Sequence, residues 1–315
     1  MGFGSIWVLN FSIYAILLTM KSGFVAIVGR PNTGKSTLLN YLLGEKVSIV
    51  SNIPQTTRFQ ARGVYNDERG QIVFVDTPGM HIPEDGLGRY LNDAVMQAKD
   101  NTDVVLYIAD TTRKPKEEEE NIVRQLKISK APVIMALNKI DKGKGHTEDY
   151  LEFWQKIMPE KNPLVISIPI SAKTGENTDR LLQEIFSHLA EGEPYYPPEI
   201  LTDFPRRLAI SDIIREKFLK RLHEELPHSL AVLVEEITER SKELTYIKAV
   251  ILLEKQNHKQ MAIGHGGHLI KEAGQEARKE LEEMFEKKIY LELTAKVVPK
   301  WQENPQILKQ LGYFL

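Results

Sequence analysis

The chain has 315 residues, 42% of them hydrophobic and 27% charged, which is enough for two folded domains with cores of their own. It contains no cysteine, and this excludes a disulfide framework, a thiolate zinc site and a cysteine nucleophile. Because the net charge is only -2, any binding to nucleic acid has to come from a local positive patch and not from the field of the whole protein.

The first segment of the chain, residues 6–18, is almost entirely apolar, and the first positive charge is Lys21. A secretory signal has basic residues ahead of its apolar core, and a membrane-spanning helix needs about 20 apolar residues, so the segment matches neither. We interpret residues 1–21 as an extension that is dispensable or results from an upstream start, with Met20 as the true start. The alternative is an anchor that lies at a membrane interface.

A strand-like apolar run over residues 24–28 leads into the pattern GxxxxGK[ST], and an apolar helical segment over residues 37–43 follows. This order of strand, loop and helix is typical of a P-loop. The glycines let backbone N–H groups point at a phosphate, Lys35 reaches the β- and γ-phosphates as a catalytic residue, and the Ser36 hydroxyl binds Mg²⁺. The predicted nucleotide-binding residues here are Gly29, Arg30, Pro31, Asn32, Thr33, Gly34, Lys35, Ser36 and Thr37.

Two later segments are predicted to complete the phosphate and magnesium site. Residues 51–58 form a polar, turn-rich loop with Thr56 and Thr57, where a nucleotide switch places a second Mg²⁺ ligand that engages only with a γ-phosphate. Next, a buried strand over residues 71–75 ends in an aspartate, which can hold Mg²⁺ through water, and a glycine that can donate its N–H to the γ-phosphate. This segment is Asp76, Thr77, Pro78 and Gly79, and all four are predicted to bind nucleotide.

Apolar runs over residues 104–109, 132–137 and 164–169 predict three more buried strands, with a helix over residues 117–129. Strands that alternate with helices predict an α/β fold, in which a mostly parallel sheet has helices on both faces. The acidic run over residues 117–120 is interpreted as the solvated start of its helix, where negative charge favours the helix dipole.

The second of these strands ends in Asn138, Lys139 and, two residues later, Asp141. An ionised aspartate only accepts hydrogen bonds, so it matches the paired N–H donors of guanine and opposes the acceptor that adenine presents. The segment therefore favours GTP over ATP. The last strand leads to Ser171, Ala172 and Lys173, whose backbone is predicted to complete the base pocket.

The remaining chain predicts a second, smaller domain. Residues 191–198 are rich in proline and indicate a stiff linker over residues 191–205. Beyond it we expect a helix over 210–222, strands over 231–238, 246–254 and 288–297, and a helix over 270–285. A GxxG loop before that helix can clamp single-stranded RNA. The predicted RNA-binding residues are Lys259, Ile263, Gly264, His265, Gly266, Gly267, His268 and Lys271, with Lys255 and Arg278 as further basic candidates.

Taken together and in this order, the P-loop, the switch threonine, the aspartate–glycine segment and the two base-recognition segments resemble a translation-factor-type GTPase of the TrmE-Era-EngA family. The GxxG segment resembles a type II KH domain, with the order αββααβ. The resemblance implies a P-loop NTPase domain over residues 22–190, the linker, and an α+β KH domain over residues 206–315. It assigns Thr57 to γ-phosphate and Mg²⁺ sensing, and makes Lys35, Thr57 and Gly79 the catalytic residues.

The same resemblance implies a GTP-hydrolysing switch that binds 16S ribosomal RNA near its 3′ end and acts in 30S subunit maturation. It implies a cytoplasmic protein, a monomer by default, with loose contact to the inner membrane. Met80 stands where Ras-like enzymes carry a water-orienting glutamine, which predicts slow intrinsic hydrolysis. Asn32 matches an asparagine with which related GTPases hold K⁺, so K⁺ is a candidate cofactor beside Mg²⁺. The alternatives are an ATP-using P-loop enzyme and a membrane-associated interaction protein with a vestigial GTPase.

Overall fold

A computed structural model of the protein describes residues 20–48, 58–59, 61–77, 87, 91, 102–127, 129–143, 145–158, 164–222, 226 and 229–313. The chain divides into two compact units, each described separately below. The first unit contains residues 1–48, 60–81 and 92–203, and the second contains residues 49–59, 82–91 and 204–315. The apolar segment at residues 6–18 lies outside the described residues, as do Thr56, Thr57, Pro78, Gly79 and Met80.

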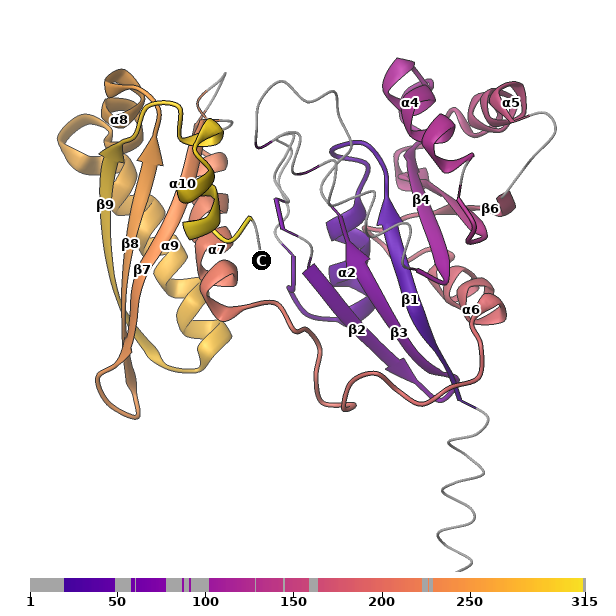
Figure 1. Ribbon diagram of the computed structural model, residues 1–315, viewed down its shortest axis with the longest axis horizontal. Coiled ribbons are helices and arrows are strands. Elements are labelled where there is room, and N and C mark those ends of the chain that lie inside the picture. Colours follow the sequence, from indigo (N-terminus) through magenta and orange to yellow (C-terminus); the bar gives the residue numbers. More distant parts are fainter. Residues whose placement is uncertain are drawn as a thin grey trace, which may run out of the picture. The chain divides into compact units, whose positions relative to one another are not determined.

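The first unit is built on a six-stranded sheet in the order β2-β3-β1-β4-β5-β6 (Figure 1). Only β2 runs antiparallel to its neighbour, and the other pairs are parallel. The strands are β1 (Lys21–Val28), β2 (Ala61–Asp67), β3 (Gly70–Asp76), β4 (Val104–Asp110), β5 (Val133–Asn138) and β6 (Leu164–Ile170). The predicted α/β fold with a mostly parallel sheet is therefore confirmed.

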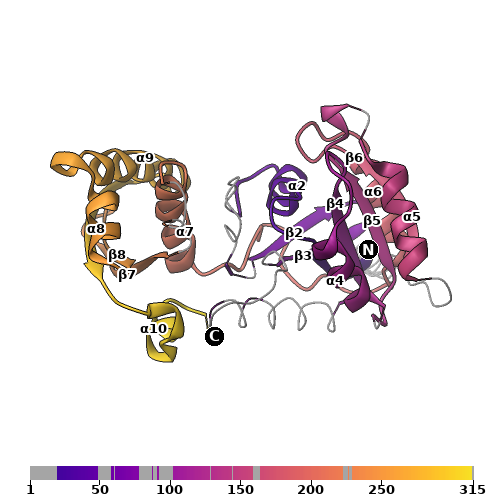
Figure 2. The ribbon, with the colours of Figure 1, turned by 90° about the horizontal axis from the view of Figure 1, so that it is seen from above.

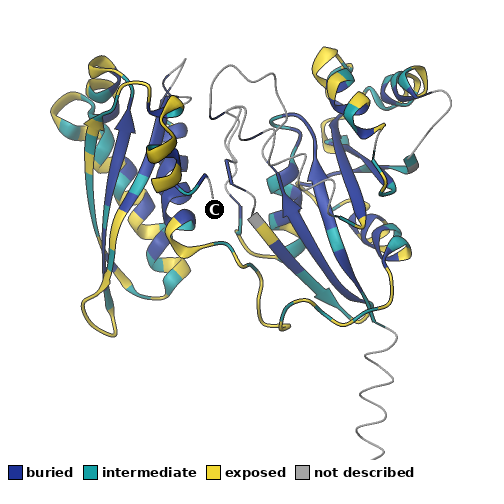
Figure 3. Ribbon diagram, in the orientation of Figure 1, coloured by how far each residue is buried: buried dark blue, intermediate teal, exposed yellow. Residues whose placement is uncertain are grey.

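Helices cover both faces of this sheet, which is why its central strands contain continuous apolar runs. On β1, Val25 and Ile27 face one core, with α2 (Lys35–Leu43) and α6 (Thr178–His188). Ala26 and Val28 face the other core, with α4 (Glu117–Leu126) and α5 (Thr147–Ile157). Figure 3 shows the central strands largely buried, and every residue of β3, β4 and β5 is buried. A short 3-10 turn, η1 (Ile140–Lys142), follows β5.

The second unit has a three-stranded sheet in the order β7-β8-β9, with β7 (Leu230–Glu239), β8 (Leu244–Leu253) and β9 (Lys288–Val297). β7 and β8 are antiparallel, whereas β8 and β9 are parallel. The helices α7 (Arg206–Leu219), α8 (Gln256–Ile263) and α9 (His268–Phe285) pack on one face of the sheet (Figure 2). Their order along the chain, αββααβ, confirms the predicted KH type II fold.

The chain end covers part of the other face of this sheet. After β9 come η3 (Trp301–Glu303) and α10 (Pro305–Gln310), which pack against apolar residues of β7 and β8. Trp301 is fully buried, and its indole N–H donates to the carbonyl oxygen of Ser229 at 2.9 Å. The aromatic residues of the tail therefore belong to the core of the second unit. Within the described ranges, no helix has the length and apolar character needed to cross a membrane.

Candidate functional site

The P-loop joins β1 to α2, and close packing leaves no room for side chains at its glycines. A Cβ on Gly34 would lie 2.2 Å from the Asn138 amide nitrogen, and Gly34 has a φ of 103°. Lys35 donates from its ammonium to the carbonyl oxygens of Gly29 and Arg30, both at 3.0 Å. Burial lowers the pKa of Lys35 to about 8. A bound phosphate would stabilise its charged form.

Residues from the end of β5 hold the P-loop in shape. Asn138 donates from its side-chain amide to the carbonyl oxygen of Thr33 at 2.7 Å. The Lys139 ammonium donates to the carbonyl oxygen of Asn32 at 2.7 Å, and Asn32 has a left-handed φ of 64°. Asparagine adopts this conformation more readily than most residues. The predicted base-recognition segment thus also fixes the predicted phosphate loop.

The predicted magnesium residues Ser36 and Asp76 lie next to one another. The Ser36 hydroxyl donates to Oδ2 of Asp76 at 2.8 Å. The Asp76 side chain is fully buried, and its Oδ1 has no hydrogen-bond partner among the described residues. Burial raises the pKa of Asp76, while the charge of Lys35 opposes this shift. A hydroxyl beside a carboxylate with an unpaired buried oxygen fits Mg²⁺, which prefers oxygen ligands and keeps several waters.

The predicted guanine-recognition residues come together at the ends of β5 and β6. The Ser171 hydroxyl donates to Oδ1 of Asp141 at 2.8 Å, which orients the carboxylate. The backbone N–H of Ala172 donates to the Asn138 side-chain oxygen at 2.8 Å. Lys173 follows in the same turn and is exposed. The arrangement presents a fixed acceptor for the two N–H donors of guanine.

A buried ionic network beside the P-loop was not predicted. Arg30 donates from Nε to Glu119, and its Nη2 lies 3.4 Å from Oδ2 of Asp110. The Glu119 side chain is 1% exposed and also accepts from the Tyr150 hydroxyl at 3.2 Å. The interpretation of residues 117–120 as a solvated run is therefore wrong at Glu119.

The burial of Glu119 could have been predicted from the helical period of α4. Glu119 shares its buried face with Ile122, Val123 and Leu126, a spacing of three, four and seven residues. Composition alone suggested four equivalent glutamates. The helical period separates the one that faces the P-loop from its neighbours.

The GxxG loop lies between α8 and α9, where Gly264 ends α8 and η2 (His265–Gly267) follows. A Cβ on Gly266 or Gly267 would meet no heavy atom within 4 Å, so a ligand can approach this backbone closely. His265 and His268 are exposed. Histidine at position 265 offers a phosphate less positive charge than a lysine or an arginine would. Lys259 and Ile263 lie on α8.

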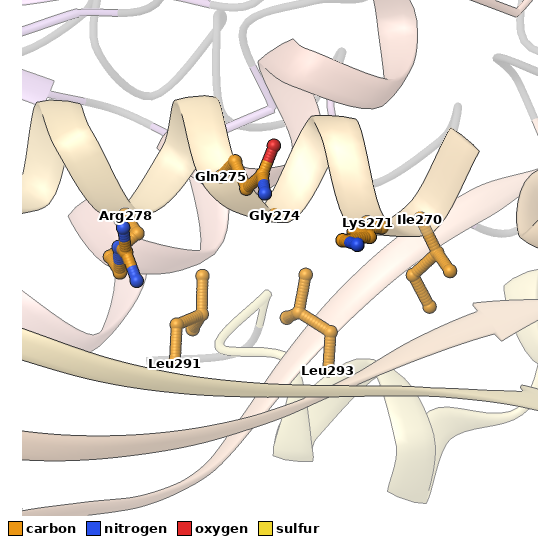
Figure 4. A pocket seen from close by; sticks show the side chains of 7 residues that line it. All are labelled: Ile270, Lys271, Gly274, Gln275, Arg278, Leu291 and Leu293. Atoms are coloured by element: carbon orange, nitrogen blue, oxygen red, sulfur yellow. The ribbon is translucent and has the colours of Figure 1, made fainter. Parts of the chain in front are cut away.

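A groove between α9 and β9 was missing from the prediction, apart from its two basic residues. It has a volume of about 270 Å³, with the apolar side chains of Leu291 and Leu293 on its β9 side (Figure 4). A Cβ on Gly274 would lie 3.1 Å from Leu293, so a larger residue there would narrow the groove. The residues from α9 are Ile270, Lys271, Gly274, Gln275 and Arg278. This groove could not be predicted from the sequence, because it depends on how α9 is placed over β9.

The chain is similar to known proteins along almost its whole length. Residues 24–139 match the 50S ribosome-binding GTPase family, and residues 225–302 match the KH domain family. GTPase Era of Geotalea daltonii is 42% identical over 293 residues, covering 93% of this chain and 97% of the relative. GTPase Era of Clostridium acetobutylicum is also 42% identical over 293 residues, covering 93% and 98%.

Two solved structures match as well. A crystal structure of Era in complex with MgGDPNP and nucleotides 1506–1542 of 16S ribosomal RNA has a TM-score of 0.88 and 40% identity. The match covers 94% of this chain and 100% of the chain in that crystal structure. A variant of Aquifex aeolicus Era bound to GDP and AlF4⁻ has a TM-score of 0.86 and 40% identity, with the same coverage.

Because Glu119 pairs with Arg30 in the interior, we expect substitution of Glu119 to lower the free energy of unfolding more than substitution of its neighbour Glu120. Glu119→Gln should lower the free energy of unfolding by about 3 kcal/mol, because it leaves a buried guanidinium without its main counter-charge. Glu120→Gln is the matched control, since its pair with Arg124 is on the surface and exposed pairs contribute about 0–1 kcal/mol. Urea unfolding of the whole chain measures both. Equal effects of the two substitutions would contradict the assignment.

The fixed acceptor at Asp141 predicts the base specificity. Asp141→Asn should weaken GTP binding by about 10- to 100-fold, because an amide donor would then face a guanine donor. Binding of xanthosine triphosphate should improve, since xanthine has a carbonyl in place of the guanine amino group. Competition against a fluorescent nucleotide measures both affinities. Asp179→Asn, at an exposed position on α6, is the control and should change neither.

Proposed function

The chain belongs to the Era family of GTPases, and we propose that it couples GTP hydrolysis to binding of 16S ribosomal RNA near its 3′ end, in 30S subunit maturation. It is an enzyme that converts GTP to GDP and phosphate. The observation that carries the proposal is the presence, in one chain, of a guanine-type P-loop site and a KH groove. The related Era structure holds a nucleotide, Mg²⁺ and 16S ribosomal RNA together.

In the nucleotide site, the proposed work of the chain is positioning and charge stabilisation. Lys35 would bind the β- and γ-phosphates, and Thr57 and Gly79 would contact the γ-phosphate. Ser36 and Asp76 would hold Mg²⁺, which when bound neutralises charge on the phosphate oxygens. Met80 offers no polar group to orient the attacking water, so basal turnover should be slow.

In the RNA site, the proposed ligand is a short single-stranded segment. The open backbone at Gly266 and Gly267 lets the sugar-phosphate chain approach, and the first N–H groups of α9 favour phosphate. Leu291 and Leu293 supply an apolar surface for bases, and the cationic side chains on α9 supply charge along the rim. Because the chain is close to neutral overall, this local surface has to provide the attraction.

Coupling between the two activities is proposed to run through the switch loop. Arg58 follows directly after Thr57 and is buried in the second unit, where it donates to the carbonyl oxygen of Leu230 at 2.8 Å. Phe59 stacks on Tyr313 in the same unit, with ring centroids 4.8 Å apart. A movement of Thr57 on loss of the γ-phosphate would therefore shift Arg58 and Phe59 and change their contacts with residues of the KH unit.

We also propose that the protein is a cytoplasmic monomer that exchanges GTP and GDP. The proposed peripheral contact with the inner membrane is through the apolar residues 6–18. The 30S subunit is the proposed assembly partner.

The RNA groove predicts a difference between two adjacent cations on α9. Arg278 lines the groove with a side chain that is 53% exposed, whereas Lys279 does not line it and is 81% exposed. Arg278→Ala should weaken binding of an RNA ending at the natural 16S 3′ end by about tenfold. It should also reduce the slope of log binding constant against log salt concentration by about one. Lys279→Ala should change neither.

The same RNA should raise GTP turnover of the unaltered chain. Binding by fluorescence anisotropy across a salt series, with turnover measured in parallel, tests both parts. RNA binding without any effect on turnover would contradict the coupling. Absence of binding would contradict the RNA-binding proposal itself.

The Asn32 position predicts a dependence on the monovalent cation. We propose that Asn32 helps to hold K⁺ against the phosphates, in the place where other GTPases use an arginine finger. Turnover should then be about tenfold or more faster in K⁺ than in Na⁺ at equal ionic strength, and Asn32→Ala should remove the difference. Equal turnover of the unaltered chain in the two salts would contradict the role of K⁺.

A further inference from the structure

We propose that Ser48 is a positioning residue for Asp76, held in place by Asn40, and that this Asn40–Ser48 clamp sets the affinity of the nucleotide complex for Mg²⁺. The inference rests on the proposed role of Asp76 at the magnesium site. Ser48 lies outside the P-loop and outside every segment that the sequence analysis singled out. Its hydroxyl nevertheless donates to Oδ2 of Asp76 at 2.7 Å, and the residue is buried.

Asn40 holds Ser48 through two hydrogen bonds and its neighbour Val47 through a third. Its side-chain oxygen accepts from the backbone N–H of Val47 at 3.0 Å and from that of Ser48 at 2.9 Å. Its side-chain nitrogen donates to the carbonyl oxygen of Ser48 at 2.7 Å. The Asn40 amide therefore binds both the N–H and the carbonyl group of Ser48. This fixes the Ser48 backbone in the position from which its hydroxyl reaches Asp76.

The clamp and the predicted metal ligand belong to the same helix face. Ser36 and Asn40 are four residues apart on α2, a spacing that places two side chains one above the other. The helix that begins at the P-loop thus supports Asp76 twice, directly through the Ser36 hydroxyl and indirectly through Asn40 and Ser48. Both contacts fall on the same oxygen, Oδ2 of Asp76.

The two oxygens of the Asp76 carboxylate have different hydrogen-bond environments. Oδ2 accepts from Ser36 and Ser48, which uses the two lone-pair positions of a carboxylate oxygen. Oδ1 is buried and has no hydrogen-bond partner within the described part of the chain. A buried, unpaired acceptor is costly, and a water on Mg²⁺ would satisfy it. Ser48 therefore holds the carboxylate in the rotation that leaves Oδ1 for the metal's water.

Loss of the Ser48 hydroxyl should act on the metal and not on the base or the phosphates. Removing an outer partner of a metal-binding group typically lowers metal affinity by about 10- to 100-fold. We therefore expect Ser48→Ala to raise the Mg²⁺ concentration that half-maximally slows release of GDP by about tenfold or more. The rate of GDP release in excess EDTA should stay close to that of the unaltered chain.

The experiment follows release of a fluorescent GDP analogue from the full chain across a series of free Mg²⁺ concentrations. Ser187→Ala is the matched control, because this hydroxyl on α6 is exposed and bonds only the Glu184 carbonyl oxygen among the described residues. Ser48→Thr keeps the hydroxyl and should restore most of the Mg²⁺ dependence. Asn40→Ala, which keeps the hydroxyl but loosens the clamp, should shift the Mg²⁺ midpoint in the same direction as Ser48→Ala.

Three results would overturn the inference. They are an unchanged Mg²⁺ midpoint in Ser48→Ala, an equal acceleration of release with and without Mg²⁺, and failure of Ser48→Thr to restore the midpoint in a folded protein. If Ser48→Ala does not fold, an unchanged midpoint in Asn40→Ala overturns it instead. If Mg²⁺ has no effect on the unaltered chain, the proposed magnesium site fails, and that result is distinct from failure of the clamp alone.

Discussion

The nucleotide site depends on one side chain, the amide of Asn138. Its nitrogen donates to the carbonyl oxygen of Thr33 in the P-loop, and its oxygen accepts from the N–H of Ala172. A single buried amide thus joins the phosphate loop to both base-recognition segments, which are far apart in the sequence. Its position also explains Gly34, since a Cβ there would lie 2.2 Å from the amide nitrogen. The predicted base-recognition and phosphate-binding segments are therefore joined by direct hydrogen bonds, and a change in one would disturb the other.

Much of the fold could be predicted because its strands are buried on both faces. Such strands are continuous apolar runs, and the runs at β1, β3, β4, β5 and β6 stand out from the polar loops between them. The P-loop and the segment after β5 could be predicted for a different reason. Their chemistry requires fixed residue types at fixed spacings, so the pattern itself carries the function. The αββααβ order of the second unit came from the resemblance of the GxxG segment to a type II KH domain, because the apolar periods predicted the helix after that loop but not α8 before it.

The rest of the site could not be predicted, because it depends on contacts between residues that are distant in the sequence. Ser48 gains its role only because Asn40 turns the loop after α2 back onto Asp76. Leu293 forms a groove only because Gly274 leaves space above it. Glu119 is the intermediate case. Its burial could be predicted from the helical period of α4, but its pairing with Arg30 could not.

The two sites also differ in how solvent acts on them, and this difference constrains any coupling between them. Lys35, Asp76 and Asn138 are buried and held by short hydrogen bonds, so salt screens them weakly. The cations at the groove between α9 and β9, the proposed RNA site, are exposed, and salt screens them strongly. A nucleotide signal can therefore reach the groove reliably only through packing, not through a long-range field. Residues 58–59 meet this requirement, because they follow the predicted switch threonine directly and are buried in the KH unit against Leu230 and Tyr313.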